Sequence, residues 1–579
     1  MAAKTLIQNG LVYDGTGNKP TESDVLIENG KIAAIAPHGT IKASNAKKIN
    51  AQGMWVTPGF LDTHTHYDAE LALSPGLTES VRHGVTSVVV GSCSVSFVSS
   101  SPEDCADMFT RVEAVPREVV LPLLKKIKKW DSPAGYRKWI DKHPLGPNVA
   151  SFMGHSDLRA RAMGLHRSVT TERPTSAEQK QMEVTLAEAL NAGFLGMSCM
   201  TNPWDRLDGD REWSASLPSY YARRAEKKPL LEMLRRRHRI HQSAPNLVTR
   251  VNVLGMALAS GGLARESLRT TVITMMDLKA DPYVLGLTNF VAWLANKVFR
   301  GNFRWQSPPV PFDLYYDGWD SVLFEEFYAG QKIRDAAKDL NSRHALLSDP
   351  IFRKRFKKDL LRKLAPKVWH RDLADTTILS CPDKSVVGKS FAQVAAERGQ
   401  DAIDTFLDLL LKYDRDIRWH TCLANHRPEK VAEIMKNPAT LMSFADSGAH
   451  LRNMAFYNFP LRMLKQVRDA ELAGKAIMPV EKAVWRLTGE LAQWFGLDAG
   501  ALKPGAQADV VVIDPKRLDD SLEKVKLQPW SKGFKFDRIV NEGAAARHVF
   551  IAGQAAIING RPAPALGKKR MGRFLESVL

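Results

Sequence analysis

The segment VTPGFLDTHTHYD, residues 56–68, carries the strongest structural signal in this chain. An apolar run passes through Pro-Gly into His64-Thr65-His66. Residues two apart in an extended strand point to the same side, so the two imidazoles would face one way. Zn²⁺ binds neutral imidazole nitrogen readily. The segment therefore predicts a buried strand that ends in a metal site.

Beyond this segment, residues 58–498 alternate strand-like and helical patterns. The strand-like runs are SVVVGSC, VASFMGH, GFLGMSCM and TTVITMMD. Such alternation predicts parallel βα units, and at this length a (β/α)₈ barrel of the TIM type fits better than an open sheet. The stretch from about 280 to 371 breaks the rhythm, being rich first in aromatic and then in basic residues. We interpret it as an insertion over the barrel mouth or, equally well, as a packing element outside the barrel.

The two ends of the chain share a different pattern. Residues 1–57 and 499–579 hold short apolar runs beside Gly-containing turns, for example TLIQNGLVYDG, ADVVVIDP and HVFIAGQ. This pattern is typical of hairpins. The sequence therefore predicts an α/β protein in which one small β-sandwich, built from both termini, flanks the barrel.

Composition restricts the class of protein. The 579 residues are 44% hydrophobic and include five cysteines, too few for a disulfide framework. The N-terminal residues hold no apolar run typical of a signal peptide, and no run of about 18 apolar residues predicts a membrane span. We expect a cytoplasmic protein, and a homo-oligomer is left open.

The formal net charge is +18, with basic clusters at 235–239 (RRRHR) and 353–358 (RKRFKK). No nucleic-acid module accompanies this charge, so no nucleic acid is expected as a partner. The segment 353–367 alternates basic and apolar residues at helical spacing. The ordinary interpretation is a helix with a solvated basic face, and weak peripheral association with a membrane is the alternative.

Five motifs together resemble a known superfamily. PGFLDTHTHYD at 58–68 resembles the first-strand motif of the amidohydrolase superfamily. GVTSVVVGSCSVS (84–96), MGHSDLRARAMG (153–164), AGFLGMSCM (192–200) and FADSGAHL (444–451) are similar to the second-, third-, fourth- and eighth-strand motifs of its N-acyl-D-amino-acid deacylases. The likeness runs in order along nearly the whole chain and is weakest through 280–371.

The resemblance implies a set of metal ligands. His64, His66 and Cys93 match metal-binding residues, and Asp446 matches the catalytic aspartate, which also contacts metal. A thiolate and imidazoles suit Zn²⁺, and one or two ions are expected. Without the resemblance, Cys93 would be interpreted as a buried core cysteine.

One departure affects the number of ions. The deacylases also supply a histidine from each of the fifth and sixth strands. Here the matching positions hold Ala244, in IHQSAPN, and Met275 or Met276, in TVITMMD. One remaining set is His64, His66 and Asp446, completed by Cys93 or water.

Other residues are candidates for substrate binding. His155 and His450 could bind the carbonyl or the oxyanion, while Arg159 and Arg452 could pair with a substrate carboxylate. Structural roles explain these four residues as well. Trp419, His420 and His426 belong either to the seventh strand or to ordinary packing.

The resemblance implies a hydrolase of the amide C–N bond of a small-molecule N-acyl amino acid, of D configuration in the family. Metal-activated water would attack, with Asp446 as general base and then acid. The aromatic residues of 280–330 favour a bulky or apolar acyl group. A cyclic-amide or carbamoyl hydrolase is one alternative, disfavoured because GFLGMSCM lacks a bridging lysine. An inactive scaffold of the same fold is the other.

Overall fold

The apolar runs of the middle segment form eight parallel strands, as predicted. This computed structural model describes residues 4–362, 366–531 and 535–579. The strands pair in the order β16-β12-β11-β10-β9-β8-β7-β6. Their bounds are β6 Phe60–Asp62, β7 Val85–Val90, β8 Asn148–Gly154, β9 Gly196–Met200, β10 Ile240–Ala244, β11 Arg269–Ile273, β12 Asn302–Gln306 and β16 Thr440–Leu441.

Backbone contacts after β6 and β16 join the two edges of this sheet. Thr65 bridges Ser447 in parallel, and the backbone N–H of His66 donates to the Ser447 carbonyl at 2.8 Å. Strands β7 and β8 are buried along their whole length, as expected for parallel strands covered by helices. The barrel prediction is confirmed.

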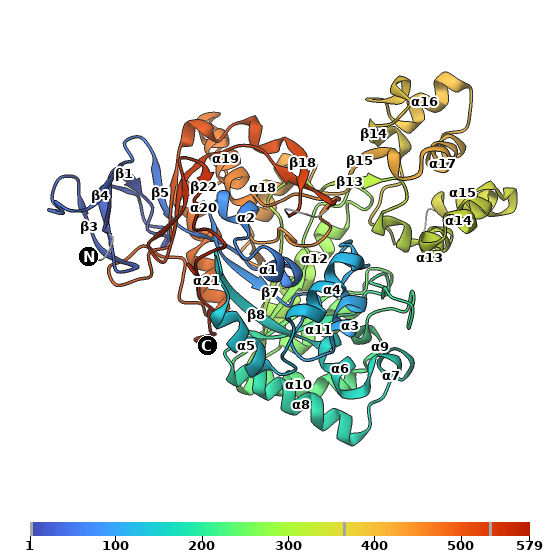
Figure 1. The fold of residues 1–579 in the computed structure, drawn as a ribbon, viewed down its shortest axis with the longest axis horizontal. Coiled ribbons are helices and arrows are strands. Elements are labelled where there is room, and N and C mark those ends of the chain that lie inside the picture. The colour runs from blue at the N-terminus through green and yellow to red at the C-terminus, as the bar shows by residue number, and fades with distance from the viewer. Residues whose placement is uncertain (1–3, 363–365, 532–534) are drawn as a thin grey trace.

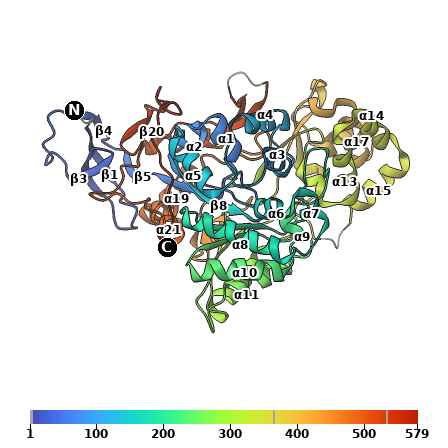
Figure 2. The same cartoon turned by 60° about the horizontal axis from the view of Figure 1, so that its bottom comes forward.

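Helices cover the outside of the barrel (Figures 1 and 2). A capping box at Thr175 and Glu178 starts α8, which buries Met182, Leu186 and Leu190. The covering helices are α1 Asp68–Leu73, α2 Thr78–Arg82, α3 Pro102–Phe109, α4 Arg117–Ile127, α5 Pro133–Lys142, α6 His155–Met163, α7 Leu165–Thr170, α8 Ser176–Asn191, α9 Pro218–Tyr221, α10 Arg224–Arg236, α11 Asn252–Ser260, α12 Val284–Trp293, α18 Pro428–Lys436, α19 Phe459–Leu472, α20 Val480–Leu487 and α21 Gly489–Phe495.

The two ends of the chain share one sheet, which confirms the predicted β unit. Strand β17 pairs antiparallel with β5 on one side and β20 on the other. The sheet contains β1 Thr5–Val12, β2 Thr21–Glu28, β3 Lys31–Pro37, β4 Lys47–Asn50, β5 Trp55–Pro58, β17 Val510–Ile513, β20 Ala546–Ile551, β21 Gln554–Ile558 and β22 Arg561–Pro562. A separate pair joins β18 Val525–Pro529 to β19 Asp537–Asn541.

The stretch 280–371 contains a strand of the barrel. Strand β12 pairs with β11 and β16 and is the seventh strand of the barrel. The chain leaves the barrel only after β12 and forms a lobe, seen at the right of Figure 1. The lobe contains β13 Asp313–Asp317, α13 Tyr328–Asp335, α14 Leu340–Ser348, α15 Pro350–Leu360, β14 Thr376–Ser380, α16 Phe391–Arg398, α17 Ala402–Tyr413 and β15 Arg418–Cys422.

Trp419 and His420 therefore do not lie on the seventh barrel strand. They belong to β15, the centre of the three-stranded antiparallel sheet β13-β15-β14. Trp419 is buried in an aromatic core with Trp369 and Phe406. His420 Nε2 lies 2.9 Å from Asp313 Oδ1. The packing interpretation holds for these residues, because they form part of the lobe, which has a hydrophobic core separate from the barrel.

The basic segment 353–358 lies on α15, which buries Phe352 and Phe356. Arg353 and Lys357 pair with Asp408 and Asp404 of α17. Residues 363–365, further along the same basic stretch, lie outside the described residues. Across the ranges 4–362, 366–531 and 535–579, no helix is long and apolar enough to cross a membrane.

Candidate metal centre

His64 and His66 follow β6 and point into the carboxyl end of the barrel. Both side chains are buried, and their ring centroids lie 5.4 Å apart. Cys93 follows β7, and its Sγ lies 3.3 Å from His64 Nε2. Ligand atoms of these three residues lie within 4.8 Å of one another, close enough to hold one metal ion. As expected for residues two apart in an extended segment, both imidazoles lie on the same side.

Asp446 completes the group from the loop after β16. Its Oδ1 lies 3.2 Å from His66 Nε2 and 3.6 Å from His64 Nε2. Gly448 permits this approach, since its φ is +88° and a Cβ there would lie 2.6 Å from the His66 backbone. The glycine of the FADSGAHL motif is therefore needed to bring Asp446 against the histidines.

Two residues that sequence reasoning missed contact the outer nitrogens of the histidines. His64 Nδ1 lies 2.6 Å from Gln306 Oε1, and His66 Nδ1 lies 3.1 Å from Glu113 Oε1. Metal-binding histidines usually have such an acceptor on the far nitrogen, which fixes the ring and leaves the other nitrogen free to ligate. Gln306 ends β12 and Glu113 lies in the loop after α3. Only recognition of NFRWQ as a barrel strand could have revealed Gln306, and no sequence signal marks Glu113.

The electrostatics of the group favour a bound cation. Burial lowers the pKa of His64 to about 4, which keeps it in the neutral, ligating form. Burial also acts to lower the pKa of His66, but the carboxylates of Glu113 and Asp446 raise it well above its ordinary value. Burial raises the pKa of the Cys93 thiol to about 12. A metal ion can take the place of the protons that these groups otherwise retain.

The donor set fits zinc. It comprises two imidazole nitrogens, one sulfur and one carboxylate oxygen, all of which are ligands found in zinc sites. Asp446 Oδ1 is buried between the two imidazoles and makes no hydrogen bond within the part of the chain that the structure describes. Because buried polar atoms are nearly always paired, this oxygen indicates a missing cationic or donor group.

The fifth and sixth strands offer no histidine to this site. Strand β10 ends at Ala244, which lines the cavity, and β11 is followed by Thr274 and Met276, which line it as well. Met275 is buried in the core instead. Among the described residues, the ligands expected for a second ion in the deacylases are therefore absent from these positions.

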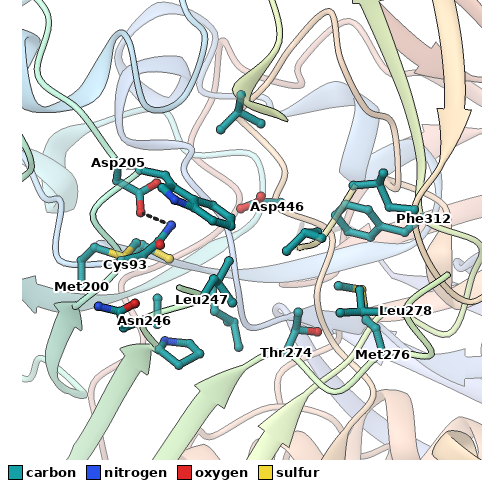
Figure 3. A pocket seen from close by; sticks show the side chains of 18 of the residues that line it. Cys93, Met200, Asp205, Asn246, Leu247, Thr274, Met276, Leu278, Phe312 and Asp446 are labelled. Carbon is teal, nitrogen blue, oxygen red and sulfur yellow. Dashed lines mark hydrogen bonds between the residues drawn. The ribbon is translucent and has the colours of Figure 1, made fainter. Parts of the chain in front are cut away.

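The site opens into a cavity of about 270 Å³. Figure 3 shows Cys93 and Asp205 on one side, and Met276, Leu278 and Phe312 on the other. Asn202 Nδ2 donates to Asp205 Oδ2 at 3.1 Å, and burial raises the pKa of Asp205 to about 7. The cavity therefore has a polar end at the metal centre and an apolar far side. Leu314, Leu323 and Val368 of the lobe also line it.

Of the four predicted substrate-binding residues, the structure brings only His450 to the cavity. His155, Arg159 and Arg452 do not line it, and their role in substrate binding stays a prediction. Arg159 Nε donates to Glu226 Oε1 at 2.9 Å, and its other nitrogens donate to backbone carbonyls. His155 Nε2 lies 3.1 Å from the same Glu226 oxygen, and Arg452 pairs with Asp317. These groups are engaged within the protein.

Arg159→Met is expected to destabilise the fold by about 3 kcal/mol or more, because it leaves Glu226 buried beside His155 alone. Arg161→Met is the control. This residue lies on the same helix, but its pair with Asp131 is exposed and should contribute less than about 1 kcal/mol. The urea midpoints of the two variants test the prediction. Equal midpoints would contradict a structural role for Arg159.

Comparisons with known proteins agree with this fold. The chain is 47% identical over 523 residues to an uncharacterised protein of Mycobacterium tuberculosis, covering 90% of this chain and 85% of that protein. It is 27% identical over 525 residues to N-acyl-D-glutamate deacylase of Alcaligenes xylosoxydans xylosoxydans, covering 89% and 88%. The fold is similar to that of N-acyl-D-glutamate deacylase from Bordetella bronchiseptica, solved with zinc and a phosphonate inhibitor, with a TM-score of 0.64 at 22% identity over the whole of both chains. No family model matches.

Along nearly its whole length the chain resembles N-acyl-D-amino-acid deacylases of the amidohydrolase superfamily, and it has the same fold as a solved member of that group. Its characterised relatives include N-acyl-D-glutamate deacylase and D-aminoacylase.

Proposed function

We propose that this protein is a zinc-dependent hydrolase that cleaves the amide C–N bond of an N-acyl amino acid. The observation that carries the proposal is the convergence of His64, His66, Cys93 and Asp446 at one end of a single cavity. One ion is proposed rather than two, because Ala244 and Met276 stand where a second ion would need histidines.

His64 and His66 would bind the ion through Nε2, with Cys93 as the third ligand. Gln306 hydrogen-bonds the His64 ring at Nδ1, and Glu113 lies at ion-pair distance from His66 Nδ1. A Zn²⁺ ion bound here would supply the Lewis acidity that polarises a carbonyl and eases the deprotonation of water. The chain itself must then move the protons.

Asp446 is the residue placed to do so. Its Oδ1 takes the proton of the attacking water and delivers it to the leaving nitrogen as the C–N bond breaks. A C–O bond forms, and the products are a carboxylate and an amine. Burial lowers the pKa of His450, so its ring is neutral and can donate one hydrogen bond to the developing oxyanion.

Arg250 is proposed to hold the carboxylate of the amino acid. It is the single lysine or arginine among the described residues that line the cavity. Its Nη1 lies 2.5 Å from Asp281 Oδ2, which orients the guanidinium. The acyl group would occupy the apolar side formed by Met276, Leu278 and Phe312.

A substrate panel tests this function. Amine release is measured from N-acyl amino acids of both configurations and from the same compounds with the carboxylate converted to an amide. The wild type is expected to prefer the carboxylate by about tenfold or more, and Arg250→Met to lose that preference. Hydrolysis of cyclic amides alone would contradict the proposal.

A further inference from the structure

Helices α11 and α12 expose an apolar face to solvent. On α11 the exposed side chains follow helical spacing, and three exposed aromatic rings lie on α12 or directly before it. Tyr283 is 86% exposed, Phe290 52% and Trp293 54%. The members of this face, called here the α11–α12 face, are Val251, Leu254, Leu258, Tyr283, Leu287, Phe290 and Trp293.

The sequence under this face is free of charge. Residues 251–264 and 282–296 contain no Asp, Glu, Lys or Arg. A surface helix normally turns charged residues outward, as α10 does with Arg224, Lys228 and Arg236. In Figure 2, α11 lies beside α10 near the lower edge of the molecule. A contiguous apolar face without charged residues is typical of an interaction site.

The face is continuous with the cavity of the metal centre. Val284 and Val291 of α12 and Val253 of α11 turn inward and line the cavity. Leu287 does both, since it is 41% exposed and also lines the cavity. Apolar side chains therefore connect the outer surface with the apolar side of the site.

The border of the face is basic. Lys297 and Arg300 follow α12, both are exposed, and neither has an ion-pair partner in the described part of the chain. Exposed tryptophan and tyrosine favour the boundary between lipid and water, and neighbouring cations attract anionic headgroups. The chain as a whole carries a formal charge of +18. This combination fits an anionic membrane surface better than a second copy of the same basic protein.

We propose that the α11–α12 face docks on an anionic membrane and that the substrate is a long-chain N-acyl amino acid drawn from that surface. This inference rests on the proposed hydrolase function. The acyl chain enters past Leu287 and lies on the apolar side of the cavity, which places the amide at the metal centre. Water adds to the carbonyl, the C–N bond breaks, and a fatty acid and an amino acid leave.

Flotation with vesicles tests the docking. The full chain is mixed with vesicles of equimolar phosphatidylcholine and phosphatidylglycerol, and the bound fraction is compared with that of Phe290→Asp/Trp293→Asp. The variant is expected to bind at least about tenfold less. The control Ile351→Asp/Leu472→Asp removes two exposed apolar side chains elsewhere and is expected to bind as the wild type does. Wild-type protein that does not float, or a variant that floats equally well, would overturn the docking.

Hydrolysis tests the substrate class separately. On the same vesicles, the ratio of kcat/KM for N-palmitoyl and N-acetyl amino acids is expected to fall about tenfold or more in the variant, with N-acetyl hydrolysis unchanged. An unchanged ratio would overturn the membrane route. Loss of a dimer in the variant, seen by light scattering without any vesicle binding, would assign the face to a second copy instead. A wild type that floats but cleaves neither amide would leave the docking standing and contradict the hydrolase function and this substrate class together.

Discussion

Asp446→Asn is expected to lower kcat by about a thousandfold while the protein keeps its metal. The asparagine preserves the shape of the side chain beside His64 and His66 but cannot accept the proton of the attacking water. General acid–base residues contribute about 10²–10⁴-fold to rate, and here one carboxylate serves both proton transfers. The measurement is single-turnover amine release at saturating substrate, together with metal content.

Asp509→Asn provides the matched control. Asp509 is also a buried carboxylate, but it accepts hydrogen bonds from Asn148 and Gln507 at the junction with the terminal sheet, away from the cavity. The Asp509→Asn variant is expected to have a kcat within a few fold of the wild-type value. Metal lost together with activity in Asp446→Asn would instead assign Asp446 to essential ligation, and full activity would contradict the mechanism.

His64→Ala is expected to weaken zinc binding by at least about a hundredfold and to abolish hydrolysis. Residues that only orient a ligand already contribute about 10–100-fold to metal affinity, and His64 is proposed to be a ligand itself. Competition with a chromophoric chelator measures the affinity. Excess zinc should restore part of the activity.

His241→Ala is the control for this variant. His241 is a buried histidine on barrel strand β10, yet its side chain does not line the cavity. Its replacement should leave the zinc affinity unchanged. Equal affinities for the two variants would show that His64 does not bind the ion.

The sequence allowed the barrel and the terminal sheet to be predicted, because both follow from local patterns. Strands β7 and β8 are rich in apolar residues and buried along their whole length, and the two histidines that follow β6 stand two residues apart. Strand β12 was not predicted, because NFRWQ lies between the uncharged α12 and the aromatic lobe. Apolar residues are frequent on both sides of it, so the pattern of apolar and polar residues does not mark where a strand begins or ends. Gln306, the last residue of this strand, was therefore not predicted as a site residue. The sequence left Trp419 open between the seventh strand and ordinary packing, since a lobe with its own aromatic core contains strands that resemble those of a barrel.

The site was predicted in part. His64, His66, Cys93 and Asp446 lie in recognisable motifs at strand ends, and these four residues converge. Arg159 lies in a similar motif, but its burial against Glu226 depends on how α6 and α10 pack, which the local sequence does not indicate. Glu113 reaches His66 from a loop, where neither periodicity nor spacing indicates direction.

Metal content per chain tests the central claim most directly. Purified wild-type protein is loaded with zinc, dialysed against metal-free buffer and analysed by elemental analysis. The arrangement of His64, His66, Cys93 and Asp446 predicts about one tightly held zinc ion per chain. A chain that retains no metal after loading would contradict the proposed hydrolase and favour a scaffold of the same fold.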